Sequence, residues 1–91
     1  MKPELSAVPR LAPGVRLNEK SQRERMLLMP ERALKLLGPS LEIVERCDGK
    51  HSVQQIAEAL HKLYDKAEPQ RITDDLLGYL ALLHDQRAID F

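Results

Sequence analysis

The chain has 91 residues, a length that accommodates one small domain. Its composition is that of an ordinary globular protein, with 43% hydrophobic and 31% charged residues. Lysine plus arginine and aspartate plus glutamate each total 14, so the formal net charge is zero. This balance argues against non-specific binding to nucleic acid, because such binding relies on a basic surface.

The cysteine content and the hydropathy pattern suggest where the protein works. A single cysteine, Cys47, cannot form an internal disulfide, so a reducing compartment is expected. The N-terminal segment has no apolar stretch of signal-peptide length, and no segment approaches about 18 apolar residues. We therefore expect a cytoplasmic protein with no membrane partner.

The N-terminal part of the chain predicts an arm followed by a strand. Residues 1–8 carry no periodic pattern and are expected to form a flexible arm, whereas residues 9–91 form the single domain. Val15-Arg16-Leu17 alternates as a half-buried strand does. The polar run from Asn18 to Arg25 is interpreted as an exposed hairpin loop.

Two apolar runs follow this loop. Arg25 to Met29 and Ala33 to Leu37 flank a turn at Pro30. Together with the first strand, these runs suggest a small antiparallel meander of three strands.

Three helices are predicted after the strands. Pro39 is suited to the first position of a short amphipathic helix that reaches Cys47. Ser52 and Gln55 have the spacing of a reciprocal capping box and open the second helix. The third helix is expected from about Ile72 to Gln86, and a short extended tail follows. The order predicts an α+β, winged-helix-like domain with three short antiparallel strands followed by three helices.

The last helix is apolar on more than one side. Ile72, Leu76 and Leu83 belong to one stripe of ordinary width, whereas Leu77 and Leu82 fall outside it. Such a helix needs a second neighbour, which is the rest of the fold, a second subunit or a bound partner.

Residues capable of catalysis or metal binding do not form a recognisable constellation. Cys47 ends an apolar stripe and is interpreted as a buried structural thiol. His51, His61 and His84 lack metal-ligand spacing. Asp74-Asp75 is explained by the dipole of a first helical turn. We therefore expect a protein that is not an enzyme and holds no metal and no cofactor.

Peptide binding and DNA binding are the two functions that remain to be compared. The last helix has Arg71 as its only lysine or arginine and is a poor reader of DNA, although the helix from His51 to Lys66 stays open for that role. A small sheet has two edge strands, and an extended peptide can add to an edge such as the strand at Ala33 to Leu37. The alternative is that the arm or a second subunit covers this edge.

Short motifs recur in a defined order from Pro9 to Ile89. They are Pro9-Arg10-Leu11, Val15-Arg16-Leu17, Leu27-Leu28-Met29-Pro30-Glu31, Leu34-Lys35-Leu36, Ile43-Val44, Cys47-Asp48-Gly49, Ser52-Val53, Ile56-Ala57, Asp75-Leu76, Tyr79-Leu80 and Leu83. In their order and spacing the sequence resembles the PqqD family, the small accessory proteins of pyrroloquinoline quinone biosynthesis.

The resemblance implies a peptide chaperone that is a recognition element for a ribosomally made peptide. It would bind the leader of the precursor peptide PqqA along the third strand and against the last helix, and present it to the radical SAM enzyme PqqE. The implied contact residues are Ala33, Leu34, Lys35, Leu36, Thr73, Leu76, Leu77 and Leu80. Recognition of another ribosomally made peptide and a winged-helix DNA-binding regulator are the alternatives, and a homodimer without ligand stays open.

Overall fold

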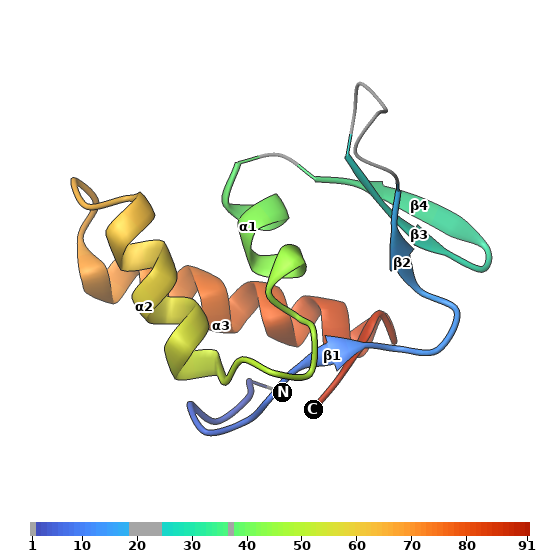
Figure 1. The fold of residues 1–91 in the computed structure, drawn as a ribbon, viewed down its shortest axis with the longest axis horizontal. Coiled ribbons are helices and arrows are strands. Elements are labelled where there is room, and N and C mark those ends of the chain that lie inside the picture. Colours follow the sequence, from blue (N-terminus) through green and yellow to red (C-terminus); the bar gives the residue numbers. More distant parts are fainter. Residues whose placement is uncertain (1, 19–24, 37) are drawn as a thin grey trace.

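The computed structural model describes residues 2–18, 25–36 and 38–91 (Figure 1). Its strands and helices are β1 (Arg10–Leu11), β2 (Arg16–Leu17), β3 (Met26–Met29), β4 (Arg32–Lys35), α1 (Pro39–Glu45), α2 (Val53–Leu63), α3 (Pro69–Asp85) and β5 (Ile89–Asp90). The α+β class is confirmed, and the winged-helix label describes the architecture only loosely.

The strands form two small antiparallel sheets. β2, β3 and β4 make the predicted meander, in which Leu27 lies opposite both Leu17 and Leu34. β1 and β5 pair in a second sheet, with Leu11 opposite Ile89. The prediction of three strands was therefore wrong in number. A strand of two residues is too short to show an alternating pattern, and the pairing of β1 with β5 joins the two ends of the chain.

The hairpin loop between β2 and β3 is only partly described. Residues 19–24 lie outside the described residues, so the predicted exposure of that segment is not tested. Asn18, at the start of the loop, is buried instead. Its Oδ1 accepts hydrogen bonds from the backbone N–H of Met26 at 3.0 Å and from Nε of Arg25 at 3.2 Å. These contacts hold the two strands together at the base of the loop.

The helices agree with the predicted order but differ at their ends. Ser52 caps α2 through both hydrogen bonds of the capping box, as predicted. α1 has seven residues and ends before Cys47, so it is shorter than expected. α3 begins at Pro69, which takes the first helical position rather than lying in the preceding loop.

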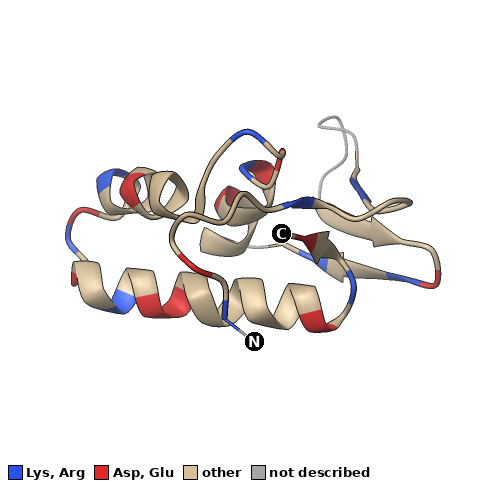
Figure 2. Cartoon of the chain, turned by 90° about the horizontal axis from the view of Figure 1, so that it is seen from below, with Lys and Arg blue, Asp and Glu red and all other residues tan. Residues whose placement is uncertain are grey.

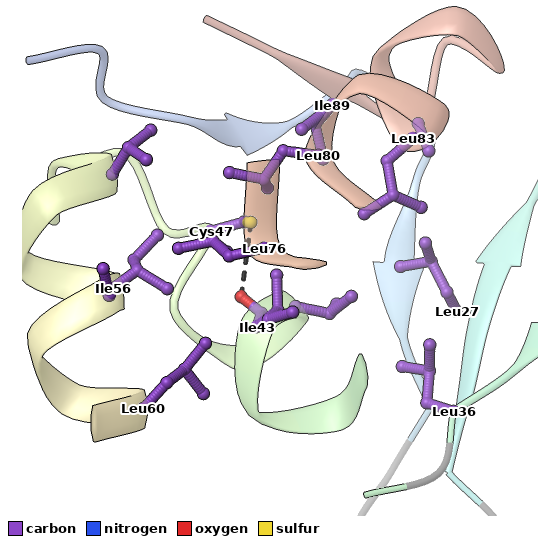
Figure 3. Close-up of a cluster of buried hydrophobic side chains, with 14 residues drawn as sticks. Leu27, Leu36, Ile43, Cys47, Ile56, Leu60, Leu76, Leu80, Leu83 and Ile89 are labelled. Carbon is purple, nitrogen blue, oxygen red and sulfur yellow. Dashed lines mark hydrogen bonds between the residues drawn. The ribbon is translucent and has the colours of Figure 1, made fainter. Parts of the chain in front are cut away.

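The core is a single cluster of apolar side chains between the three helices and the three-stranded sheet (Figure 3). Leu27 and Leu36 enter it from the sheet side, and Ile43, Ile56 and Leu76 represent the three helices. The fully buried position of Leu27 shows that the inner face of the sheet is part of this core.

The N-terminal segment contacts the start of α2. The carbonyl oxygens of Ala7 and Leu5 accept hydrogen bonds from the backbone N–H groups of Val53 and Gln54, at 2.8 and 3.0 Å. These N–H groups have no partner inside the helix, so the segment completes the cap that Ser52 begins. Because contacts do not measure motion, the flexibility of residues 1–8 stays a prediction.

The turn between α1 and α2 depends on Asp48. Its Oδ1 accepts hydrogen bonds from the backbone N–H groups of Lys50 and His51, and its carboxylate lies 2.9 Å from Nδ1 of His51. The side-chain hydrogen bond with His51 is the main cause that lowers the pKa of Asp48 below 3.8.

We expect Asp48→Ala to lower the free energy of unfolding by about 1 kcal/mol at neutral pH, because it removes the acceptor of these bonds. A carboxyl group whose pKa is lower in the folded protein than in the unfolded chain stabilises the folded protein at pH values above the unfolded pKa. That contribution disappears as the pH falls through the folded pKa. Thermal unfolding of the wild type and of Asp48→Ala between pH 7 and pH 3 measures how their difference in stability depends on pH. A difference in Tm that persists undiminished at the acid end would contradict the prediction.

Candidate functional site

β4 is one of the two edge strands of the three-stranded sheet, because β3 lies between β2 and β4. The backbone N–H of Leu36 donates to the carbonyl of Arg25 at 2.9 Å, which fixes the phase of the antiparallel ladder. Since alternate residues of such a strand bond to opposite neighbours, Leu34 and Leu36 bond to β3, and the backbone groups of Ala33 and Lys35 point away from it. The edge thus has the geometry needed for strand addition.

The side chains of β4 divide between the two faces of the sheet. Leu34 lies opposite the buried Leu27 and is half-buried on the core side. Ala33 and Lys35 are exposed on the outer side, where Ala33 lies opposite Leu28. A strand added to this edge would therefore meet an apolar inner face and a mixed outer face.

Three of the predicted contact residues are core residues. Leu36 is 2% exposed, and Leu76 and Leu80 are 0% exposed. Their side chains pack inside the protein, as Figure 3 shows, and are not presented on the surface. The reason is that Leu76 and Leu80 lie at the centre of the apolar stripe of α3, and Leu36 continues the inner face of β4.

The two remaining predicted residues of α3, Thr73 and Leu77, lie on the flank that faces α2. Nε2 of His61 in α2 is 3.2 Å from Oγ1 of Thr73, which fixes the orientation of this flank. Leu77 is one helical turn further on and is half-buried. Burial and this contact therefore place the predicted residues of α3 in the core or toward α2 rather than toward β4.

The opposite flank of α3 contains residues that the sequence reasoning did not select. Tyr79 is half-buried, and burial is the main cause that raises the pKa of its phenol, while the nearby Ser40 side chain at the start of α1 acts in the opposite direction. Gln86 lines a cavity together with the turn between β3 and β4. The sequence could have indicated Tyr79, because it lies at the edge of the apolar stripe opposite Thr73 when the helix is read at 100° per residue.

Two cavities lie near the ends of β4. Beyond its C-terminal end, an apolar cavity of about 180 Å³ lies between the three helices, with Pro39, Ile43 and Ile72 in its wall. At its N-terminal end, a cavity of about 410 Å³ is lined by Arg32, Gln86 and Arg87 among others. Of these two cavities, the second has a residue of β4, Arg32, in its wall.

The described residues offer little for catalysis. Cys47 is buried, and its Sγ donates a hydrogen bond to the carbonyl oxygen of Ile43 at 3.3 Å. Burial is the main cause that raises the pKa of this thiol to about 12, so it stays protonated, as expected of a structural cysteine. Across the described ranges, no three histidine, cysteine or acidic side chains are grouped as metal ligands. No helix in that part of the chain is long and apolar enough to cross a membrane.

Comparison with known proteins decides the family. The family described as coenzyme PQQ synthesis protein D matches residues 24–89. The chain belongs to the PqqD family. One relative, the PqqA binding protein of Xanthomonas campestris, is 35% identical over 82 residues, which are 89% of this chain and 88% of that protein. Another, the bifunctional coenzyme PQQ synthesis protein C/D of Methylorubrum extorquens, is 38% identical over 86 residues, or 93% of this chain. The chain spans only 23% of that bifunctional protein.

Solved structures of PqqD proteins have the same fold. The solution structure of the PqqD part of Methylobacterium extorquens PqqCD, described as a stand-alone recognition element for ribosomally made peptides, matches with a TM-score of 0.76 at 37% identity. The match covers 97% of this chain and 94% of that one. The crystal structure of PqqD from Xanthomonas campestris matches with a TM-score of 0.56 at 34% identity, over 92% and 93% of the two chains. The resemblance noted in the sequence is thus confirmed.

Proposed function

We propose that this chain binds the precursor peptide PqqA and acts as its chaperone in coenzyme PQQ synthesis. The peptide adds as a strand to the free edge of β4. The observation that carries this proposal is the position of Ala33, whose backbone groups point away from β3 on an exposed edge strand. Among the described residues, no backbone partner occupies this position. The name of relatives such as the Xanthomonas protein, PqqA binding protein, supports the choice of peptide.

The side chains around the edge support an extended and partly apolar ligand. Leu34 on the inner face and Leu28 on the outer face are both half-buried, so each has apolar surface left to cover. Leu82, on the flank of α3 that carries Tyr79, is 47% exposed. A peptide paired with β4 can place alternate side chains against the inner face and the outer face of the sheet.

The wider role follows from this binding. We propose that the complex presents PqqA to the radical SAM enzyme PqqE, that the chain itself is not an enzyme, and that it works in the cytoplasm. Its free edge also allows a homodimer before the peptide binds.

The charge on α3 favours peptide binding over DNA binding. The exposed charged residues of α3 are Asp74, Asp75 and Asp85 together with Arg71, which is its only lysine or arginine (Figure 2). A recognition helix in the major groove would instead need donors for phosphates and base edges.

Calorimetric titration with a synthetic PqqA precursor peptide tests the proposed function. We expect saturable one-to-one binding with a negative change in heat capacity, because apolar side chains are buried, and a weak dependence on salt. A folded protein that gives no binding signal at either of two protein concentrations would overturn the proposal. The two concentrations show whether a dimer closes the edge.

A further inference from the structure

Arg87 has a backbone conformation that arginine rarely adopts. Its φ is +61°, and it is the one residue other than glycine with positive φ in the described part of the chain. The backbone N–H groups of Arg87 and Ala88 donate to the carbonyls of His84 and Leu83, which is the Schellman arrangement at the C-terminus of α3. Glycine takes this position at no steric cost. An arginine here needs a reason in its side chain.

Arg87 is one of the residues that line a cavity beside β4. The cavity has a volume of about 410 Å³ and lies between the end of α3 and the turn that joins β3 to β4. Val15, Met29 and Pro30 give it an apolar wall, and Arg32 is a second arginine in its lining. Arg32 is also the first residue of β4, so the cavity lies at one end of the proposed peptide path.

The charges in this cavity favour an anion. Arg32 and Arg87 face one acidic lining residue, Glu31. Neither arginine has an ion-pair partner among the described residues. The helix dipole explains the presence of one arginine near the C-terminus of α3, because a cation is favourable at that end of a helix. A second arginine is in excess of that need, and the guanidinium group of an arginine binds a carboxylate through two parallel hydrogen bonds.

We propose that this cavity binds a carboxylate side chain, aspartate or glutamate, of the peptide that pairs with β4. The proposal rests on the proposed function and adds a specificity element to it. The guanidinium groups of Arg32 and Arg87 bind the carboxylate, and the apolar wall contacts the carbon atoms that carry it. This contact fixes the register of the peptide, because only one position along an extended chain reaches the end of β4.

The experiment measures the affinity of the PqqA precursor peptide for Arg87→Gly and Arg32→Gln. A matched control, Lys62→Gln, removes an exposed cation of α2 that lines neither cavity described above. We expect each cavity variant to weaken binding at least fivefold and the control to change it less than twofold. Glycine accepts a positive φ, so Arg87→Gly should unfold at the same temperature as the wild type or higher. Loss of affinity then cannot come from loss of fold.

A second set of peptides identifies the carboxylate. Each aspartate or glutamate of the precursor is replaced in turn by asparagine or glutamine. One replacement should weaken binding to the wild type as much as Arg87→Gly does, with no further loss when both changes are combined. Affinities of both cavity variants within twofold of the wild type would overturn the proposal while leaving the proposed function intact. A wild type that binds no peptide would instead overturn the proposed function.

Discussion

Replacing Leu80 with alanine should lower the free energy of unfolding by about 2–5 kcal/mol, one of the largest losses that a single substitution can cause in this fold. Leu80 lies at the centre of the buried stripe of α3 and is 0% exposed. Its removal leaves a cavity that the surrounding helices cannot close completely, because the core is one connected cluster. A domain of this size has roughly 5–15 kcal/mol of stability in total, so the variant should be close to unfolding.

The control lies on the same helix. Leu82 is 47% exposed, so Leu82→Ala should change the free energy of unfolding by no more than about 0.5 kcal/mol. Urea denaturation of the two variants and the wild type, followed by circular dichroism, gives both values. Equal losses at Leu80 and Leu82 would show that α3 is packed differently from the structure described.

Replacing Ala33 with proline should weaken the binding of the PqqA precursor peptide at least tenfold, which corresponds to about 1.4 kcal/mol. Proline removes the N–H that points away from β3, and its ring occupies the space of an added strand. The ladder between β3 and β4 loses no hydrogen bond, because Leu34 and Leu36 provide its donors. Edge strands accept proline at such positions, so the fold should survive.

A second variant at the same position separates the effect of the lost backbone N–H from the effect of a changed side chain. Ala33→Thr keeps the N–H and has a side chain suited to a strand, so the affinity should stay within about threefold of the wild-type value. Calorimetry measures binding, and thermal unfolding confirms that both variants are folded. An Ala33→Pro protein that is folded and binds as tightly as the wild type would exclude strand addition at this edge.

The fold was predictable wherever a pattern of sufficient length was present. The capping box at Ser52 located the start of α2, and the alternation of Leu34 with Lys35 located β4. The sheet of β1 and β5 left no such signal, because its pairing depends on the turn at Arg87. Hydrophobic periodicity describes one element at a time and contains no information on which distant segments meet.

The position of the edge strand was predictable from the sequence, whereas the packing of α3 was not. The backbone groups of Ala33 and Lys35, two of the residues that the resemblance implied, point away from β3, and binding of a peptide there stays a proposal. On α3, the resemblance implied Thr73, Leu76, Leu77 and Leu80 as contacts, and Leu76 and Leu80 proved to be fully buried. A residue at the centre of an apolar stripe faces the core, whereas a contact with a partner comes from the border of the stripe, where Tyr79 lies. Which border faces the sheet depends on tertiary packing.

Amide hydrogen exchange at Ala33 tests strand addition most directly. Nuclear magnetic resonance measures the exchange rate of each backbone amide with and without a saturating amount of the PqqA precursor peptide. We predict that exchange at Ala33 slows at least tenfold on binding, because its N–H gains a partner, while Leu34, already bonded to β3, changes less. Saturating binding that leaves the exchange of Ala33 unchanged would contradict the addition of the peptide to β4.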